Sequence, residues 1–199
     1  MTDPRLEIRV TGFGGQGIIL TGLIIGKAVA LYHGRHAALV QNYGPEARGS
    51  ACRADLILAG EPIDYPAVLT PNVLIVLSQD GYATHKGRLR PDGLLLLDED
   101  LVRPDKESPI LHAAIPATRL AVETGHKIMA NIVMLGFLTA LTDLVGHDQM
   151  RQAVASSVPP GTDEKNLSAF DTGHQYGTRW MQTHLGGGNG RNTHPLLRK

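Results

Sequence analysis

Apolar and polar positions along the first half of the chain form blocks that predict buried strands separated by turns and helices. Residues 6–11 are an apolar run that predicts a first strand, and residues 16–33 place apolar side chains at helical spacing. The side chains expected to face inward from this helix are Ile19, Leu23, Val29 and Ala30. A strand that turns on glycines into a helix is therefore the first predicted unit.

Five further apolar runs predict strands at residues 37–41, 51–58, 73–77, 94–97 and 110–115. The runs at 73–77 and 94–97 are continuously apolar, as in parallel strands covered on both faces, and a short helix is expected over 79–86. No helix fits between residues 41 and 51, so a loop joins those two strands. This order predicts an α/β fold, an open Rossmann-like and mostly parallel sheet with helices on both faces.

The chain beyond residue 117 predicts a helical C-terminal part. The expected helices cover residues 118–124, 127–145, 148–157 and 163–184. Asn131 shares the apolar stripe of Ile128, Leu135 and Leu138, where its amide either ties the helix to backbone groups or faces a ligand. We expect one domain over residues 1–185 and a flexible, glycine-rich tail over 186–199.

Charge and composition exclude several functional classes. Lys and Arg total 19 against 19 Asp and Glu, so no net charge favours nucleic acid or an anionic membrane. Hydrophobic residues make up 42% of the chain, enough for a core, yet no run reaches the length of a membrane span. Charged residues from Asp3 to Arg9 interrupt any leader-like apolar stretch, so a soluble, cytoplasmic protein is expected.

The glycine-rich turn after the first strand is the strongest chemical signal. Gly12-Phe13-Gly14-Gly15-Gln16-Gly17 fits the pattern G-x-G-x-x-G between a strand and a helix. Such a turn leaves N–H groups unpaired at a helix N-terminus, where phosphate is favoured. However, Leu39, Val40, Gln41 and Asn42 stand where a dinucleotide fold requires a carboxylate for the ribose. The turn therefore predicts a phosphate-bearing ligand, with NAD disfavoured.

Other catalytic patterns do not occur in the sequence. The nine histidines lack metal-ligand spacing, no G-x-S-x-G elbow is present, and the glycine turn lacks the Lys-Ser/Thr of a P-loop. The single cysteine, Cys52, is expected to be a small buried residue, and one thiol cannot supply the four ligands of an iron–sulfur cluster. The chain is expected to be part of an enzyme, with no catalytic residues of its own.

Several motifs together resemble the gamma subunit (or gamma domain) of 2-oxoacid:ferredoxin oxidoreductases, the group that acts on 2-oxoglutarate, pyruvate or 2-oxoisovalerate. They are the glycine turn, the segment Tyr43-Gly44-Pro45-Glu46-Ala47-Arg48-Gly49, the segment Glu61-Pro62-Ile63-Asp64-Tyr65-Pro66, Ser78-Gln79, and the helix with Asn131 and Leu135-Gly136. The Y-G-P-E-A-R-G segment is the most diagnostic of these. The resemblance covers roughly residues 5–180.

The resemblance implies a complex that oxidatively decarboxylates a 2-oxoacid, with 2-oxoglutarate expected, to acyl-CoA and CO2. Thiamine diphosphate, Mg²⁺ and [4Fe-4S] clusters would be carried by partner alpha, beta and, where present, delta subunits, with ferredoxin as electron acceptor. This chain would help to bind coenzyme A and close the cleft. The implied ligand-binding residues are Gly12, Gly14, Gly15, Gln16, Gly17, Tyr43, Glu46, Arg48 and Asn131. The alternatives are a stand-alone NAD(P)-binding dehydrogenase and a purely structural scaffold subunit.

Overall fold

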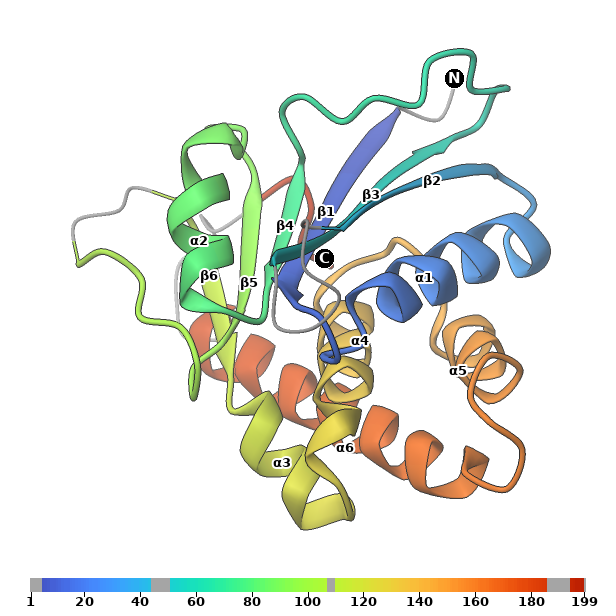
Figure 1. The fold of residues 1–199 in the computed structure, drawn as a ribbon, viewed down its shortest axis with the longest axis vertical. Coiled ribbons are helices and arrows are strands. Elements are labelled where there is room, and N and C mark those ends of the chain that lie inside the picture. Colours follow the sequence, from blue (N-terminus) through green and yellow to red (C-terminus); the bar gives the residue numbers. More distant parts are fainter. Residues whose placement is uncertain (1–4, 44–50, 107–109, 186–193, 199) are drawn as a thin grey trace.

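The chain folds around one six-stranded sheet (Figure 1). The computed structural model describes residues 5–43, 51–106, 110–185 and 194–198. The sheet order is β2-β3-β1-β4-β5-β6. The strands are β1 (Leu6–Phe13), β2 (His36–Tyr43), β3 (Ala51–Ala59), β4 (Val73–Val76), β5 (Leu94–Asp98) and β6 (His112–Ile115).

One strand of this sheet, β3, runs opposite to the other five. β1, β4, β5 and β6 run parallel to one another, whereas β3 lies antiparallel between β1 and β2. The register places Gly12 opposite Cys52, next to the glycine turn. The predicted α/β fold and mostly parallel sheet are confirmed. The loop predicted between β2 and β3 lies at residues 44–50, outside the described residues.

Helices cover both faces of the sheet (Figure 1). Side chains of α1, α4, α5 and α6 share the larger core with one sheet face, while α2 covers β4 and β5 on the other. The helices are α1 (Ile18–Tyr32), α2 (Gln79–His85), α3 (Ala117–Thr124), α4 (Ala130–Leu141), α5 (His147–Ala155) and α6 (Asp163–Leu185). Two short 3-10 turns are η1 (Lys86–Arg88) and η2 (Lys127–Met129).

Glycines allow α4 and α6 to cross in close contact. A Cβ atom on Gly136 would overlap the carbonyl of Phe170, and one on Gly173 would overlap the carbonyl of Val133. Backbone therefore packs on backbone at this crossing, which fixes the position of the first turn of α4. Because that turn carries Asn131, the crossing also sets the distance between α4 and the glycine turn.

Two details of the predicted helices are wrong. Leu23 and Ala30 are exposed, and the buried positions of α1 are Ile18, Thr21, Gly22, Ile24, Ile25, Ala28 and Val29. The helix predicted over 127–145 is a 3-10 turn followed by α4, which ends where Thr142 adopts an extended backbone. Ile128 consequently leaves the apolar stripe and is 60% exposed.

The sheet face opposite α1 holds a buried ion pair. Arg9 donates to both carboxylate oxygens of Asp55, at 2.7 and 2.9 Å, and to the carbonyl of Val68 at 2.8 Å. Arg9 is 1% exposed, so β1 and β3 are joined by a desolvated charge pair as well as by their ladder.

The segment 194–198, which lies within the predicted tail, packs against the domain. Leu197 is buried, and the backbone N–H of Arg198 donates to the carbonyl of Leu141 at 2.7 Å. The Arg198 side chain also donates to Asp143. These contacts lie beyond the expected end of the domain at residue 185.

Candidate functional site: the glycine turn and its two pockets

The glycine turn joins the end of β1 to the start of α1. Gly15 and Gly17 adopt positive φ angles of 93° and 73°, which other residues rarely adopt. The backbone N–H groups of Gly14 and Gly15 donate to no other described residue, and both residues are exposed. The turn therefore presents unpaired donors at the N-terminus of α1, where the helix dipole favours an anion.

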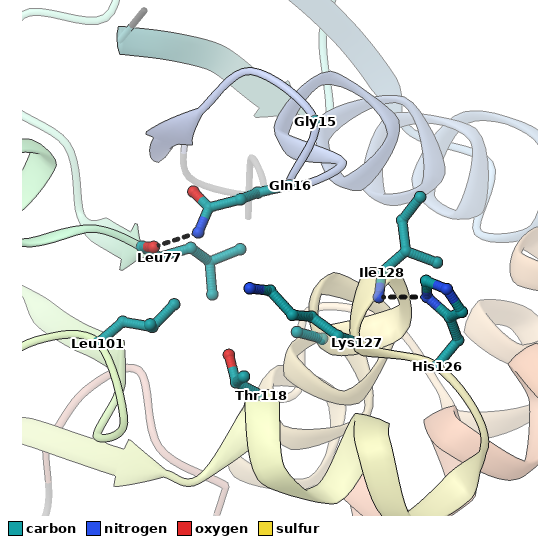
Figure 2. A pocket seen from close by; sticks show the side chains of 9 residues that line it. Gly15, Gln16, Leu77, Leu101, Thr118, His126, Lys127 and Ile128 are labelled. Atoms are coloured by element: carbon teal, nitrogen blue, oxygen red, sulfur yellow. Dashed lines mark hydrogen bonds between the residues drawn. The ribbon is translucent and has the colours of Figure 1, made fainter. Parts of the chain in front are cut away.

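The Gln16 side chain holds the turn against the sheet (Figure 2). Its Nε2 donates to the carbonyl of Leu77, directly after β4, at 2.7 Å, and its Oε1 accepts from the N–H of Phe13 at 2.6 Å. These bonds bridge the carboxyl ends of β1 and β4. Among the predicted ligand-binding residues, Gln16 thus uses its amide to shape the turn.

The Asn131 side chain binds the backbone of the glycine turn. It is 2% exposed, and its Nδ2 donates to the carbonyl of Gly17 at 3.3 Å. The amide thus contacts backbone, one of the two roles that the sequence left open, and Asn131 also lines the large pocket. Its neighbour Gly17 has no room for a Cβ, because one would overlap this amide.

A large pocket of about 760 Å³ opens on one side of the turn. This volume lies within the range of about 300–1,000 Å³ typical of small-molecule sites. Its lining combines the turn with α1, the start of α4 and the start of α6: Phe13, Gly14, Gly15, Gly17, Ile18, Ile19, Leu20, Cys52, Gly125, His126, Ile128, Met129, Asn131, Ile132, Val158, Pro159, Thr162, Lys165 and Asn166. The lining is mostly apolar.

A small pocket of about 290 Å³ lies on the other side of Gly15 (Figure 2). It is lined by Gly15, Gln16, Leu77, Leu101, Thr118, His126, Lys127, Ile128 and Ala130. The two pockets share Gly15, His126 and Ile128. They adjoin at the turn, where β1 and β4 lead to opposite sides of the sheet, a position at which open α/β sheets commonly bind ligands.

Burial raises the pKa of two acidic groups beside the pockets, the carboxyl of Asp98 and the thiol of Cys52. Asp98 is the last residue of β5, and its carboxylate accepts from the N–H and the hydroxyl of Thr118 at 3.0 and 2.6 Å. These bonds cap the N-terminus of α3, and burial raises the pKa of the Asp98 carboxyl. Cys52, buried as predicted, lines the large pocket, and burial raises the pKa of its thiol. A thiol with a raised pKa is a poor nucleophile.

The remaining predicted residues lie apart from this geometry or outside it. Gly12 packs beneath Gln16 and Ile18 inside the turn. Tyr43 ends β2, the edge strand, and β3 separates it from β1. Glu46 and Arg48 lie outside the described residues.

Sequence reasoning missed the pocket-lining residues at the start of η2 and in α6. His126, Lys127 and Lys165 line the pockets although they lie more than a hundred residues from the turn. The only local signal was Gly125, which ends α3 with a φ of 142° and turns the chain toward the site.

The described residues contain no cluster of His, Cys, Asp or Glu suited to a metal ion. Within the same parts of the chain, no helix is long and apolar enough to span a membrane.

Comparison with known proteins gives consistent matches. A family model described as pyruvate ferredoxin/flavodoxin oxidoreductase matches residues 7–176. The chain is 49% identical over 174 residues to the 2-oxoglutarate synthase subunit KorC of Methanocaldococcus jannaschii, covering 86% of this chain and 93% of that protein.

Two solved structures share the fold. One is the gamma subunit of a keto/oxoacid ferredoxin oxidoreductase from Geobacter sulfurreducens PCA, with a TM-score of 0.79, 36% identity, and coverage of 87% of this chain and 96% of that one. The other is the 2-oxoglutarate:ferredoxin oxidoreductase of Magnetococcus marinus with 2-oxoglutarate, coenzyme A and succinyl-CoA bound. It has a TM-score of 0.80 at 23% identity, over 89% of this chain and 32% of that one, and this likeness concerns the fold alone.

Proposed function

This chain belongs to the pyruvate ferredoxin/flavodoxin oxidoreductase family, and on that premise we propose that it is the gamma subunit of a 2-oxoglutarate:ferredoxin oxidoreductase. The complex would convert the 2-oxoacid to an acyl-CoA and CO2 and pass electrons to ferredoxin. Alpha, beta and, where present, delta subunits would carry thiamine diphosphate, Mg²⁺ and [4Fe-4S] clusters. The single cysteine supports this division, because a [4Fe-4S] cluster requires four thiolates.

The choice of 2-oxoglutarate rests on relatedness. The relative with 49% identity, the KorC subunit, is named for 2-oxoglutarate synthesis and aligns over nearly its whole length. The residues that recognise the acid would lie mostly on the partner subunits.

For this chain we propose a role in binding coenzyme A through its phosphates. The observation that carries the proposal is the pair of N–H groups at Gly14 and Gly15, which donate to no other residue that the structure describes. Both glycines line the large pocket at the N-terminus of α1. Phosphate oxygens accept strongly from such groups. Gly12, Gln16, Gly17 and Asn131 would act by shaping the turn, while Tyr43, Glu46 and Arg48 stay candidates from the sequence.

The arrangement of β2 argues against the alternative of a stand-alone NAD(P) dehydrogenase. In dinucleotide folds the strand beside β1 ends in the carboxylate that holds the ribose. Here β3 occupies that place, and β2 lies two strands from β1, about 10 Å away. Neither Gln41 nor Asn42 at its end is acidic.

We also propose that a partner subunit closes the cleft over the pockets. Ile128 and Leu101 line the small pocket yet are 60% and 37% exposed. Exposed apolar side chains around a pocket are typical of surfaces covered by another chain.

The enzyme assignment is tested by purifying the protein from its own cells without oxygen. We expect larger partner chains, brown colour from iron–sulfur clusters, and dye reduction that requires coenzyme A and is fastest with 2-oxoglutarate. Faster reduction with pyruvate or 2-oxoisovalerate would show that this acid, and not 2-oxoglutarate, is the preferred substrate. A colourless single chain that binds NAD would overturn the family role.

The phosphate role is tested with charge variants of one glycine. Gly15→Asp and Gly15→Asn place side chains of nearly equal size in open space, and Asp and Asn both tolerate positive φ. We expect the KM for coenzyme A to rise about tenfold more with Asp than with Asn, since a carboxylate repels phosphate.

Gly34→Asp is the matched control, because Gly34 also has a positive φ and open surroundings but lies beyond the far end of α1. It should leave the KM unchanged. If both Gly15 variants alter only subunit assembly, the scaffold alternative is correct.

A further inference from the structure

The small pocket contains a lysine whose charge is not neutralised. Lys127 lies in η2, before α4, and its side chain extends toward Gln16 and Leu77 (Figure 2). No hydrogen bond or ion pair joins its ammonium group to any residue in the described parts of the chain. An ammonium group directed into a pocket without a carboxylate partner is suited to bind an anion.

The three acidic residues that directly precede Leu101 of this pocket are already engaged. Asp98 accepts from Thr118, and the carboxylates of Glu99 and Asp100 lie 3.1 and 3.7 Å from the guanidinium of Arg119. None of them reaches Lys127. The positive charge in the small pocket is therefore available to a ligand.

The walls of this pocket limit what else it can hold. Leu77, Leu101, Ile128 and Ala130 are apolar, and Gln16 already donates to Leu77. At about 290 Å³ the pocket is at the lower limit of a complete small-molecule site. It suits one end of a larger ligand, with a single anionic group against Lys127.

The large pocket supplies the rest of such a site. Both pockets meet at Gly15, so a ligand whose phosphates accept from the Gly14 and Gly15 N–H groups can extend to either side of the turn. Coenzyme A has this chemistry, because it carries a diphosphate and a separate phosphate monoester on its ribose.

We propose that Lys127 binds the 3′-phosphate of coenzyme A while the glycine turn binds the diphosphate. The inference rests on the proposed function, because it assigns one further group of the same ligand. It makes Lys127 a specificity-determining residue that distinguishes coenzyme A from its form without the 3′-phosphate.

Lys106 provides a matched control away from the turn. Like Lys127 it is an exposed lysine, but it lines neither pocket. Its removal takes away one positive charge outside the proposed site. It should therefore affect phosphate binding far less than the removal of Lys127.

The test compares KM values of the purified complex for coenzyme A and for 3′-dephospho-coenzyme A. Lys127→Ala should raise the KM for coenzyme A about tenfold and leave that for the dephospho form within about twofold, because a charge-assisted hydrogen bond is lost only with the first. Lys127→Arg, which keeps the charge, should restore most of the preference. Lys106→Ala should leave both values within about twofold of the unaltered complex.

Three results would overturn the assignment. They are an equal rise for both substrates in Lys127→Ala, no rise for either, or an unaltered complex that does not distinguish the two. Each leaves the role of the glycine turn intact provided that Gly15→Asp still raises both KM values. If Gly15→Asp raises neither value, the proposed function itself fails.

Discussion

The side-chain amide of Asn131 donates a hydrogen bond to the carbonyl oxygen of Gly17 across 3.3 Å, joining the first turn of α4 to the N-terminus of α1. The two residues are 114 positions apart in the sequence. Their contact holds one end of the glycine turn, and Gln16 holds the other through Leu77. The turn is thus fixed before any ligand arrives, which reduces the entropy lost on binding.

Gly17→Ala should lower the free energy of unfolding by about 2–3 kcal/mol. A Cβ at this position both strains a residue with φ of 73° and overlaps the Asn131 amide. In an Asn131→Ala background the overlap is gone and only the backbone strain remains, so the same substitution should cost about 1 kcal/mol. Denaturant titrations of the four proteins measure this difference. Equal costs in both backgrounds would contradict the contact.

Gln16→Glu should cost about 1–3 kcal/mol of stability. The carboxylate can still accept from Phe13, but it cannot donate to Leu77 and instead faces that carbonyl oxygen. Gln79 is the matched control, because it also accepts from a backbone N–H and donates to a carbonyl, both of Arg103, but on the surface. Gln79→Glu should change the unfolding midpoint by less than half as much.

Asp55→Ala should cost about 3–5 kcal/mol, because it leaves the Arg9 guanidinium buried without its counter-charge. Asp143→Ala removes the carboxylate of the exposed pair with Arg198 and should cost about 0–1 kcal/mol. Thermal unfolding of the two variants measures both. Similar losses of stability in the two variants would contradict a larger contribution from the buried Arg9–Asp55 pair.

Stability should fall as the pH is lowered through the range of His85. Burial, followed by the nearby charges of Arg9 and Arg53, lowers the pKa of His85 from 6.5 to about 4. The unfolded chain therefore binds a proton between those pH values that the folded chain does not bind. Stability consequently decreases from pH 6.5 toward 4.

A His85→Gln variant should show a shallower slope of stability over the same pH range. His174, whose pKa is also lowered by burial, would account for part of the slope that persists. Denaturant titrations at several pH values measure both proteins. An identical slope would contradict the shifted pKa of His85.

The sequence was sufficient for the order of elements and the family. The continuous apolar runs at 73–77 and 94–97 predicted β4 and β5 because parallel strands are buried on both faces. The family resemblance, drawn from the glycine turn, the Y-G-P-E-A-R-G segment and Asn131, is confirmed by the family match over residues 7–176.

The predictions that failed concern helix features that tertiary contacts determine. Leu23 has helical spacing with the core positions of α1, yet it is 48% exposed because β3 packs against Gly22 on the neighbouring face. The length of α4 could not be read from its apolar stripe, since its end depends on Thr142 adopting an extended backbone. Apolar periodicity alone does not distinguish these cases.

Only part of the candidate site could be predicted from the sequence. The glycine turn is a local motif and was found, because its residues are consecutive. Lys127 was not, because its approach to the turn depends on Gly125, on η2 and on the close crossing of α4 and α6 at Gly136. Such a residue becomes a candidate only when the pocket that it enters is known.

The most direct measurement is a structure of the purified complex with coenzyme A bound. The account predicts phosphate oxygens within about 2.7–3.2 Å of the backbone nitrogens of Gly14 and Gly15, with the ligand in the pockets on either side of the turn. Coenzyme A bound with its phosphates on partner subunits alone, and the glycine turn without a ligand, would contradict it.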